Sequence, residues 1–279
     1  MACYHQWFRS GDVAHLRPLS CGKCIGCKLE RARQWAVRCM HEAQLHEDNV
    51  FVTLTYEKAS FGQSLDYRDF QLFMKRLRKA YADKRIRFFM CGEYGERRFR
   101  PHFHALLFGL RFEDQQYFKK SDGGDHLYTS EILSRLWGHG HCLIGSVTFD
   151  SACYVARYCT TVQTLPGVSR SYEAIDLDTG EVYTRVAEFG RMSLRPGLGA
   201  AWYERFKSDV YPEGKVVVNG RKARAPTFYD RRFRAQGIGE YYKMLLRRSQ
   251  EVADIAESMP RRLEAREAVV RAGLSKRDV

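Results

Sequence analysis

The sequence predicts an α+β fold in which a ferredoxin-like, RRM-like core with a central antiparallel sheet carries two additional segments. Residues 48–163 show the hydrophobic patterns of a strand, a helix, two strands, a helix, a strand and a helix, in that order, which is typical of a split βαβ arrangement. Residues 1–47 contain a compact group of cysteines followed by a helical pattern. Residues 164–279 are basic and show no convincing hydrophobic core of their own. We therefore expect three segments with these bounds.

The composition favours a nucleic acid as the partner. Among 279 residues, lysine and arginine outnumber the acidic residues 46 to 33, which gives a formal net charge of +13. Nucleic acid ranks above a membrane because the sequence has neither a long apolar span nor a basic amphipathic anchor. Residues 191–279 hold 20 basic and 11 acidic residues, so we expect a basic C-terminal surface. The alternative is a soluble basic protein without such a partner.

The N-terminus and the cysteine usage indicate a reducing compartment. Residues 1–6 contain no apolar segment of the kind found in secretory signals, so no such signal is visible. Nine cysteines, an odd number with a tight group near the start, favour a reducing cytosol over a disulfide framework.

The cysteine group follows the pattern C-x2-C-x2-C and consists of Cys21, Cys24 and Cys27. Thiolates at this spacing in a glycine-containing loop can surround a single soft metal ion. A fourth ligand is missing from the run, and Cys3, Cys39 and His41 are the candidates. The two interpretations are a structural zinc site and three reduced thiols in a tight turn.

Each element of the first half of the chain has its own pattern. Residues 28–46 place apolar residues at helical spacing with arginines among them, which predicts an amphipathic helix. Alternation over residues 51–56 predicts a strand, and Asp66 is the expected N-cap of a helix at residues 64–81. The remaining expected elements are strands at 86–93 and 100–109, a surface loop at 112–126, a helix at 129–137, a strand at 140–149 and a helix capped by Asp150 or Ser151.

Hairpins and helices are expected beyond residue 164. Residues 176–181 resemble a turn between short strands, and Asn219-Gly220 within residues 215–224 gives a stronger hairpin signal. Residues 240–272 predict a charged helix, or a pair of helices broken near Pro260. We interpret residues 164–279 as an appended basic region.

Two histidines begin one of the predicted core strands. Successive side chains of a strand point to opposite faces, so His102 and His104 project together while Phe103 enters the core. An antiparallel pairing with residues 86–93 sets Glu93 across from the two histidines. This arrangement predicts a metal site, since two imidazoles on one strand are half of such a site. The alternative is a half-buried strand whose histidines only form hydrogen bonds.

Two tyrosines lie on the last predicted helix of the core. Tyr154 and Tyr158 are four residues apart, so both phenols lie on one helix face. Packing of two aromatic rings explains this spacing as well as a chemical role does. A chemical role requires a nucleophile that holds a cut strand covalently, which a tyrosine hydroxyl can do.

These stretches together resemble a known superfamily. Residues 51–56 (FVTLTY), residues 91–95 (CGEYG) with residues 101–104 (PHFH), and residues 154–158 (YVARY) resemble the three ordered motifs of the HUH endonucleases. In particular, the chain looks like the rolling-circle replication initiation proteins of gokushovirus-type microviruses, small single-stranded DNA bacteriophages. The cysteine group before Trp35 and residues 191–199 (RMSLRPGLG) also resemble that family, so the likeness covers most of the chain.

The resemblance implies an HUH endonuclease core and a metal-dependent tyrosine transesterification. In that reaction Glu93, His102 and His104 hold one divalent cation, Mg²⁺ or Mn²⁺, against the scissile phosphate. A tyrosine, Tyr154 or Tyr158, attacks and leaves a 5′-phosphotyrosine and a free 3′-OH. Having two tyrosines lets one hold the 5′ end while the other cuts the regenerated origin, and rejoining then closes a circle.

One departure from the family pattern concerns the cationic helper of the tyrosines. Relatives often carry lysines shortly after the second tyrosine, whereas residues 159–161 are Cys, Thr and Thr here. Arg157 is the nearest substitute. The residues expected to contact DNA are Thr53 and Thr55 of the first motif, and Arg191 and Arg195 of the basic region.

The resemblance also implies partners and a location. They are single-stranded and origin duplex DNA of the phage, with the host replication helicase, polymerase and single-strand-binding protein, in the cytoplasm of the bacterial host and without a membrane. The alternative function is a non-catalytic, zinc-stabilised DNA-binding regulator, in which the histidines are structural and the tyrosines packed. A zinc hydrolase acting on small substrates ranks last because the sequence contains no His-Glu-x-x-His helix.

Overall fold

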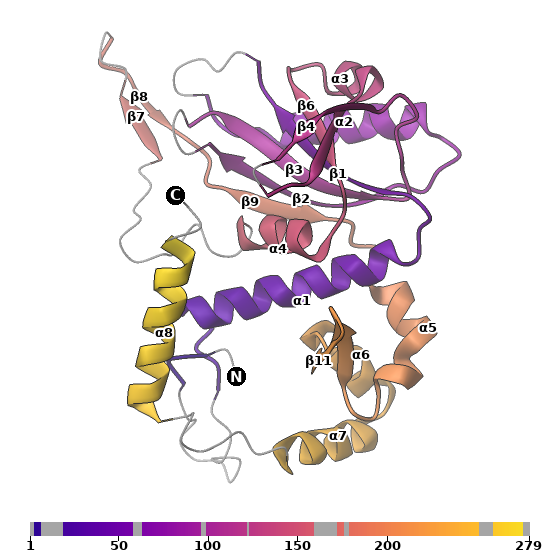
Figure 1. Cartoon of the computed structure of the whole chain (residues 1–279), viewed down its shortest axis with the longest axis vertical. Helices are drawn as coiled ribbons and strands as arrows, with labels where there is room; N and C mark the ends of the chain where they lie inside the picture. Colours follow the sequence, from indigo (N-terminus) through magenta and orange to yellow (C-terminus); the bar gives the residue numbers. More distant parts are fainter. Residues whose placement is uncertain are drawn as a thin grey trace. The chain divides into compact units, whose positions relative to one another are not determined.

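The computed structural model (Figure 1) describes residues 3–6, 19–57, 63–95, 99–121, 123–158, 172–175, 179–250 and 259–275. The chain divides into two compact units, one made of residues 1–34 and 205–279 and the other of residues 35–204. We refer to them as unit 1 and unit 2. Within the described ranges, no helix is both long and apolar enough to span a bilayer.

Unit 2 contains an antiparallel sheet. Its seven described strands are β1 (Asn49–Thr55), β2 (Arg87–Tyr94), β3 (Pro101–Phe108), β4 (Gln116–Lys120), β5 (His126–Thr129), β6 (Cys142–Gly145) and β9 (Phe189–Met192). Their order across the sheet is β4-β5-β6-β1-β3-β2-β9, and every pair is antiparallel. The predicted α+β class with a central antiparallel sheet is therefore confirmed.

One face of the sheet carries the main hydrophobic core. Figure 1 shows helices α2 (Tyr67–Ala80) and α3 (Glu131–Trp137) on this side. The buried residues of α2 recur at helical spacing and are Phe70, Phe73, Met74 and Leu77. They pack in one cluster with Leu54 and Phe103 of the strands, as the alternating pattern predicts. Asp66 caps α2, because its side chain accepts a hydrogen bond from the Arg68 N–H at 2.7 Å.

Helices also cover part of the second face. Helix α4 (Phe149–Tyr158) lies on that side in Figure 1, and its Ala152, Val155 and Ala156 are fully buried. Trp35 of α1 (Ile25–Ala43) stacks on Phe89 of β2 with ring centroids 5.1 Å apart. The expectation that this face is open for a ligand is therefore wrong for much of its area. The small side chains of α4 let the helix lie close to the strands.

The start of α4 differs from its prediction. The helix begins at Phe149, and Thr148 rather than Asp150 or Ser151 acts as the cap. Thr148 Oγ1 accepts from the Ser151 N–H at 3.1 Å, and Ser151 Oγ accepts from the Thr148 N–H at 2.9 Å. This reciprocal pair is a capping box that uses serine in place of the usual glutamate.

Two strands were not expected where they occur. Strand β4 lies in the segment predicted as a surface loop, and all five of its residues are exposed, so the sequence offers no alternation to detect. Strand β9 follows the predicted core in the chain, yet it pairs with β2 over Phe89–Met192 to Gly92–Phe189. Residues of the basic C-terminal segment thus form an edge of the central sheet.

The hairpins and C-terminal helices agree with the prediction. Strands β7 (Glu173–Ile175) and β8 (Val182–Thr184) pair, as do β10 (Lys215–Val218) and β11 (Arg221–Arg224). Asn219 and Gly220 both have positive φ, 48° and 74°, which a two-residue type I′ turn requires. Helix α7 (Ile238–Gln250) precedes α8 (Pro260–Ser275), which begins at the predicted break.

Two helices of the basic region were not predicted, namely α5 (Ala200–Val210) and α6 (Thr227–Gln236). In unit 1, α6 packs through a buried polar group. Asp230 accepts hydrogen bonds from the Tyr211 hydroxyl at 2.8 Å and from Arg248 of α7 at 2.7 Å. The Tyr211 and Phe233 rings stack with centroids 4.0 Å apart. These contacts give unit 1 an ordered interior that its charged sequence did not reveal.

Candidate metal centre

Strand register brings the candidate ligands together. In the β2–β3 pair Glu93 lies opposite His102, and in the β1–β3 pair Thr53 lies opposite His104. Residues opposite each other in an antiparallel pair project to the same face. The predicted pairing of Glu93 with the two histidines is confirmed, and the group lies on the face covered by α4.

A single carboxylate oxygen is the centre of the group. Glu93 Oε1 lies 2.7 Å from His102 Nε2 and 3.0 Å from His104 Nε2, and it accepts a hydrogen bond from the Tyr154 hydroxyl at 2.9 Å. The exposed fraction of the side chain rises from 3% for Glu93 to 9% for His104 and 15% for His102. Solvent therefore reaches the group mainly on the His102 side.

Other contacts fix both imidazole rings. The Arg100 carbonyl oxygen can only accept, so His102 Nδ1, at 3.1 Å, must carry a proton. In a neutral ring the Nε2 lone pair would then face a carboxylate lone pair at 2.7 Å, which is repulsive unless a proton or a cation lies between them. His104 Nδ1 lies 3.0 Å from Thr53 Oγ1. Outer contacts of this kind orient histidine ligands and present Nε2 to a metal.

The environment keeps Glu93 ionised. Burial raises the pKa of this carboxyl, but the charge of His104 and hydrogen bonds from both histidines outweigh burial and lower the pKa to about 2. Within the described residues, the buried Glu93 Oε2 has no hydrogen-bond partner. A buried carboxylate oxygen left without a donor is costly, and a bound cation would satisfy it.

The donor atoms fit a divalent cation. One ligand atom from each of Glu93, His102 and His104 lies within 4.8 Å of the others, so the three residues form a group able to hold a metal. In an octahedral site with bonds of about 2.0–2.1 Å, neighbouring donors are about 3 Å apart. The Glu93–His102 and Glu93–His104 separations are close to that value. Two imidazoles and one carboxylate suit several divalent ions, so the ligands alone do not select one.

Helix α4 places one of the two tyrosines at this group. The Tyr154 ring meets the His104 ring edge-on, with centroids 5.1 Å apart and an interplanar angle of 87°, and its hydroxyl points to Glu93. Tyr158 is the last residue of α4, and its side chain lies outside the described residues, as do residues 159–161. Arg157 lies in the last turn of α4, and its assistance to a tyrosine stays a prediction.

The residues expected at DNA lie in different places. Thr53 is engaged by His104, and Thr55 follows it on the same face of β1. Arg191 is exposed and lies opposite Met90, on the face that packs against α2 rather than the metal face. Its guanidinium lies over the Phe189 ring at 5.2 Å. Arg195 is exposed beyond β9, and the DNA contacts of all four residues stay predictions.

Sequence reasoning missed the supporting contacts of the histidines. The ring of Phe51 stacks on His104 with an interplanar angle of 6° and centroids 5.5 Å apart. Together with Thr53 and the Arg100 carbonyl, it fixes the histidine pair. The alternation of β1 would have shown Phe51 and Thr53 on one face, but only the β1–β3 register places them against His104.

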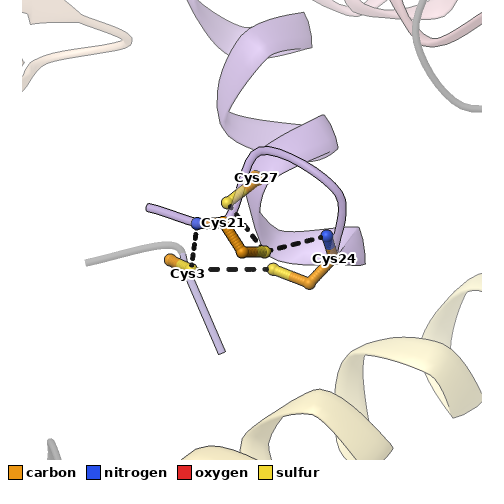
Figure 2. A group of neighbouring side chains, drawn as sticks. All are labelled: Cys3, Cys21, Cys24 and Cys27. Atoms are coloured by element: carbon orange, nitrogen blue, oxygen red, sulfur yellow. Dashed lines mark hydrogen bonds between the residues drawn. The ribbon is translucent and has the colours of Figure 1, made fainter. Parts of the chain in front are cut away.

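A second group able to hold a metal lies in unit 1. Figure 2 shows Cys3 beside Cys21, Cys24 and Cys27, and the four sulfur atoms lie within 4.8 Å of one another. Of the three candidates for a fourth ligand, Cys3 is the one that joins the group. His41 instead stacks on Trp202 with centroids 3.5 Å apart, and Cys39 is buried in α1.

The fold and the Glu93-His102-His104 group define an α+β protein with an HUH-like core. Comparison with known proteins agrees with this class. A family profile described as replication-associated protein ORF2 matches residues 49–163. No solved structure matches the chain.

Three curated relatives come from small single-stranded DNA phages. They are replication-associated protein VP4 of Bdellovibrio phage phiMH2K (34% identical over 75% of this chain and 65% of the relative), replication-associated protein ORF2 of Spiroplasma virus 4 (32%, 88% and 79%) and replication-associated protein ORF4 of Chlamydia phage 1 (30%, 83% and 59%). The match thus spans less than two thirds of the length of the first and third relatives. The chain belongs to the replication-associated protein family of these microviruses.

Proposed function

We propose that the protein initiates rolling-circle replication of a phage genome by nicking single-stranded DNA at the origin and later rejoining it. The observation that carries the proposal is the hydrogen bond from the Tyr154 hydroxyl to Glu93 Oε1, the atom that also faces both histidines. A merely packed tyrosine has no reason to aim its hydroxyl at a metal-binding carboxylate. The names of the relatives support a role in replication.

Each residue of the group has a role in this reaction. Glu93, His102 and His104 would hold one Mg²⁺ or Mn²⁺ ion, which supplies neutralisation of the non-bridging oxygens of the scissile phosphate. Thr53 and the Arg100 carbonyl keep the imidazoles oriented. His102, the most exposed ligand, lies where a phosphate has access from solvent.

The tyrosine supplies the nucleophile. The bond between Tyr154 Oη and phosphorus forms as the bond between phosphorus and the 3′-oxygen breaks. The phenol loses its proton and the departing 3′-oxygen gains one, so one phosphodiester replaces another and its energy is kept for rejoining. An unperturbed phenol has a pKa of about 10, and Arg157 is the proposed cationic helper. Tyr158, four residues on, is the proposed second nucleophile.

The rest of the chain would bind DNA. Thr53, Thr55, Arg191 and Arg195 are the proposed DNA-contacting residues, and origin duplex and single-stranded phage DNA are the proposed substrates. The host helicase, polymerase and single-strand-binding protein are the proposed partners in the cytoplasm of the bacterial host. For the cysteine group we propose a structural Zn²⁺ that has no part in this reaction.

The test is covalent capture of DNA. The full chain is incubated with labelled single-stranded oligonucleotides from its own genome and Mn²⁺, and adducts that resist SDS are counted. We expect an adduct that EDTA prevents. We expect Tyr154→Phe to reduce it and the Tyr154→Phe, Tyr158→Phe double variant to abolish it, whereas the exposed Tyr242→Phe has no effect. An adduct with the double variant would place the nucleophile elsewhere.

The alternative is a non-catalytic DNA-binding regulator stabilised by zinc, which the four-cysteine group favours. A regulator binds DNA and forms no adduct with any ion. The nickase in EDTA loses its adduct and keeps binding DNA. Measuring binding and adduct formation on the same oligonucleotides, with and without EDTA, therefore separates the two functions.

A further inference from the structure

We propose that Cys3 completes a four-thiolate zinc site, and that this ion fixes the N-terminal residues of the chain to the start of α1 and, through His5, to α8. The inference extends the structural zinc proposed above and is independent of nicking. It concerns unit 1 alone, in which residues 3–6, 19–34 and α8 are far apart in sequence.

The sulfur positions match a tetrahedral zinc site. Cys21 Sγ and Cys27 Sγ are 3.9 Å apart, and Cys3 Sγ and Cys24 Sγ are 4.0 Å apart. A regular tetrahedron with Zn–S bonds of about 2.3 Å has edges of about 3.8 Å. The separations are about twice a disulfide bond length, and all four cysteines are free thiols. Two edges of a zinc tetrahedron are therefore already present (Figure 2).

Backbone N–H groups point at the sulfur atoms. Cys21 Sγ accepts from the N–H groups of Lys23 at 3.4 Å and Cys24 at 3.3 Å. Cys3 Sγ accepts from the Cys21 N–H at 3.2 Å, and Cys24 Sγ accepts from the Tyr4 N–H at 3.4 Å. Such donors stabilise thiolates, the form that binds zinc, and they orient the ligands. The donors come from both segments, so Cys3 belongs to the same group as the C-x2-C-x2-C run.

The first turn of α1 supplies further stabilisation. Cys27 is the third residue of α1, which begins at Ile25, and Cys24 directly precedes it. The partial positive charge of a helix N-terminus favours thiolates at these positions. Gly22, with φ of 72°, takes the left-handed conformation that turns the chain between Cys21 and Cys24. Cys3 and Cys24 are 1% and 7% exposed, so the sulfur atoms lie away from water as in closed structural sites.

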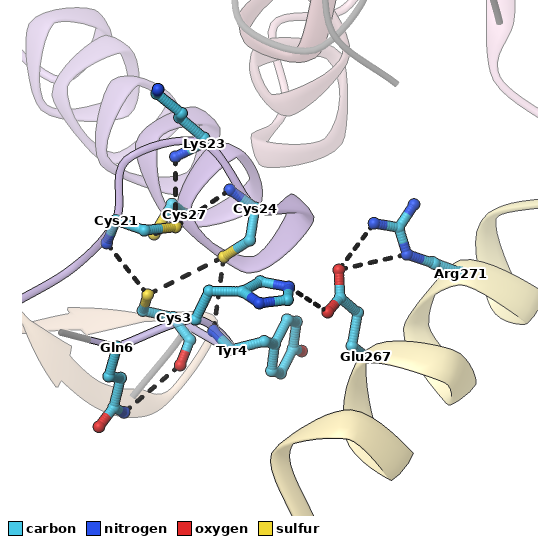
Figure 3. Close-up of polar contacts among 10 residues, drawn as sticks. Cys3, Tyr4, Gln6, Cys21, Lys23, Cys24, Cys27, Glu267 and Arg271 are labelled. Carbon is cyan, nitrogen blue, oxygen red and sulfur yellow. Dashed lines mark hydrogen bonds and ion pairs between the residues drawn. The ribbon is translucent and has the colours of Figure 1, made fainter. Parts of the chain in front are cut away.

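The same N-terminal segment contacts α8. His5, two residues after Cys3, has its Nε2 2.7 Å from Glu267 Oε2. Glu267 is 8% exposed, and its Oε1 accepts from Arg271 Nη2 at 2.7 Å. Figure 3 shows Glu267 and Arg271 of α8 next to the segment that bears Cys3 and Tyr4. Fixing Cys3 on the metal thus holds His5 against α8, and losing the metal frees both contacts.

The first experiment tests the ligand set on the full chain. Metal content is measured by mass spectrometry after dialysis, and Co²⁺ is exchanged in to record the visible spectrum of a tetrahedral thiolate site. We expect one tightly held Zn²⁺ per chain and a four-thiolate Co²⁺ spectrum. Cys3→Ser should weaken zinc binding at least about tenfold in chelator competition, whereas the half-buried Cys153→Ser in α4 should leave it unchanged. A chain without zinc, or Cys3→Ser protein with unchanged affinity and spectrum, overturns the assignment.

The second experiment tests the connection to α8. Hydrogen exchange of α8 amides is followed with zinc bound, after chelation, and in His5→Ala protein with zinc bound. We expect chelation and His5→Ala each to speed α8 exchange about fivefold, the loss of one net hydrogen bond. The matched control is the exposed Glu264→Gln, also in α8. Unchanged α8 exchange after proven zinc loss overturns the connection. Because adduct formation is measured separately, failure of nicking affects neither result.

Discussion

At the scale of single residues, Glu93 is the most informative side chain. Its Oε1 meets two imidazole nitrogens and a phenol, and its pKa stays low although the side chain is almost fully buried. Strand alternation predicted which side chains share a face, so Glu93, His102 and His104 were found from sequence. The contact of Thr53 with His104 was not, because it depends on the β1–β3 register, which no local pattern encodes.

Glu93→Gln keeps the size of the side chain and removes its charge. We expect the variant to need at least about tenfold more Mn²⁺ for half-maximal adduct formation, because one anionic ligand is lost. The measurement is a metal titration of adduct yield, with Glu264→Gln as the control for an exposed carboxylate. Identical titration curves for Glu93→Gln and wild-type protein would mean that Glu93 is not a ligand.

Thr53→Val removes the hydroxyl beside His104 Nδ1 and preserves the β-branched shape that suits β1. We expect metal affinity to fall by about 10- to 100-fold, as when outer-shell partners of histidine ligands are lost. Thr53→Ser restores the hydroxyl and should recover most of that affinity. If valine and serine variants bind Mn²⁺ equally well, the Thr53 contact does not orient His104.

At the scale of elements, β3 shows how one strand serves two purposes. Its odd-numbered residues from Phe103 join the core under α2, and His102 and His104 face α4. Alternation and helical spacing were enough to predict the core elements. Strand β4 was missed because every residue is exposed, and the α4 cap was misassigned because several cap-forming residues occur together at positions 148–151. Pairing partners, rather than local propensity, decide such elements.

The two faces of β3 predict opposite results for neighbouring substitutions. Phe103→Ala should lower the free energy of unfolding by about 3–5 kcal/mol, because a fully buried aromatic ring is lost. His102→Ala should leave stability close to that of wild type and abolish adduct formation. Urea denaturation and adduct yield measure the two effects. Stable Phe103→Ala protein, or nicking by His102→Ala protein, would contradict the assignment of the faces.

Helix α1 carries a buried histidine that makes unit 2 sensitive to acid. Burial lowers the pKa of His41 from 6.5 to about 4, and the ring stacks on Trp202. Between those values the unfolded chain binds the proton and the folded chain does not, so stability falls as the pH falls below 6.5. His41→Phe keeps an aromatic ring and removes the titration.

From about pH 7.5 to about pH 5, we expect wild-type protein to lose about 2 kcal/mol of unfolding free energy relative to His41→Phe protein. Neighbouring groups such as Glu42 titrate in both proteins, so the difference isolates residue 41. Urea denaturation at the two pH values measures it. Parallel losses in the two proteins would mean that His41 is protonated in the folded state.

At the scale of the whole molecule, charge is what the composition predicted and what register redistributes. The excess of basic residues after position 191 suggested an appended DNA-binding region. The structure instead uses the start of that region as strand β9 of the central sheet, and Glu42 of α1 accepts a hydrogen bond from the Gly199 N–H at 2.7 Å. A truncation near residue 164 would therefore damage unit 2, so charge substitutions are the better test of DNA binding.

The last prediction concerns Arg191 and Arg195, both exposed. If they contact phosphates of duplex origin DNA, neutralising both (Arg191→Gln with Arg195→Gln) should weaken binding and reduce the slope of log affinity against log salt by about 2, since each lost phosphate contact releases about one counterion less. Fluorescence anisotropy across a salt series measures the slope. The control removes equal charge from exposed positions of α2, Lys75→Gln with Lys79→Gln, and should leave the slope unchanged. Equal slopes in the two double variants would show that the arginine pair contributes only to the general charge, and that the phosphate contacts lie elsewhere.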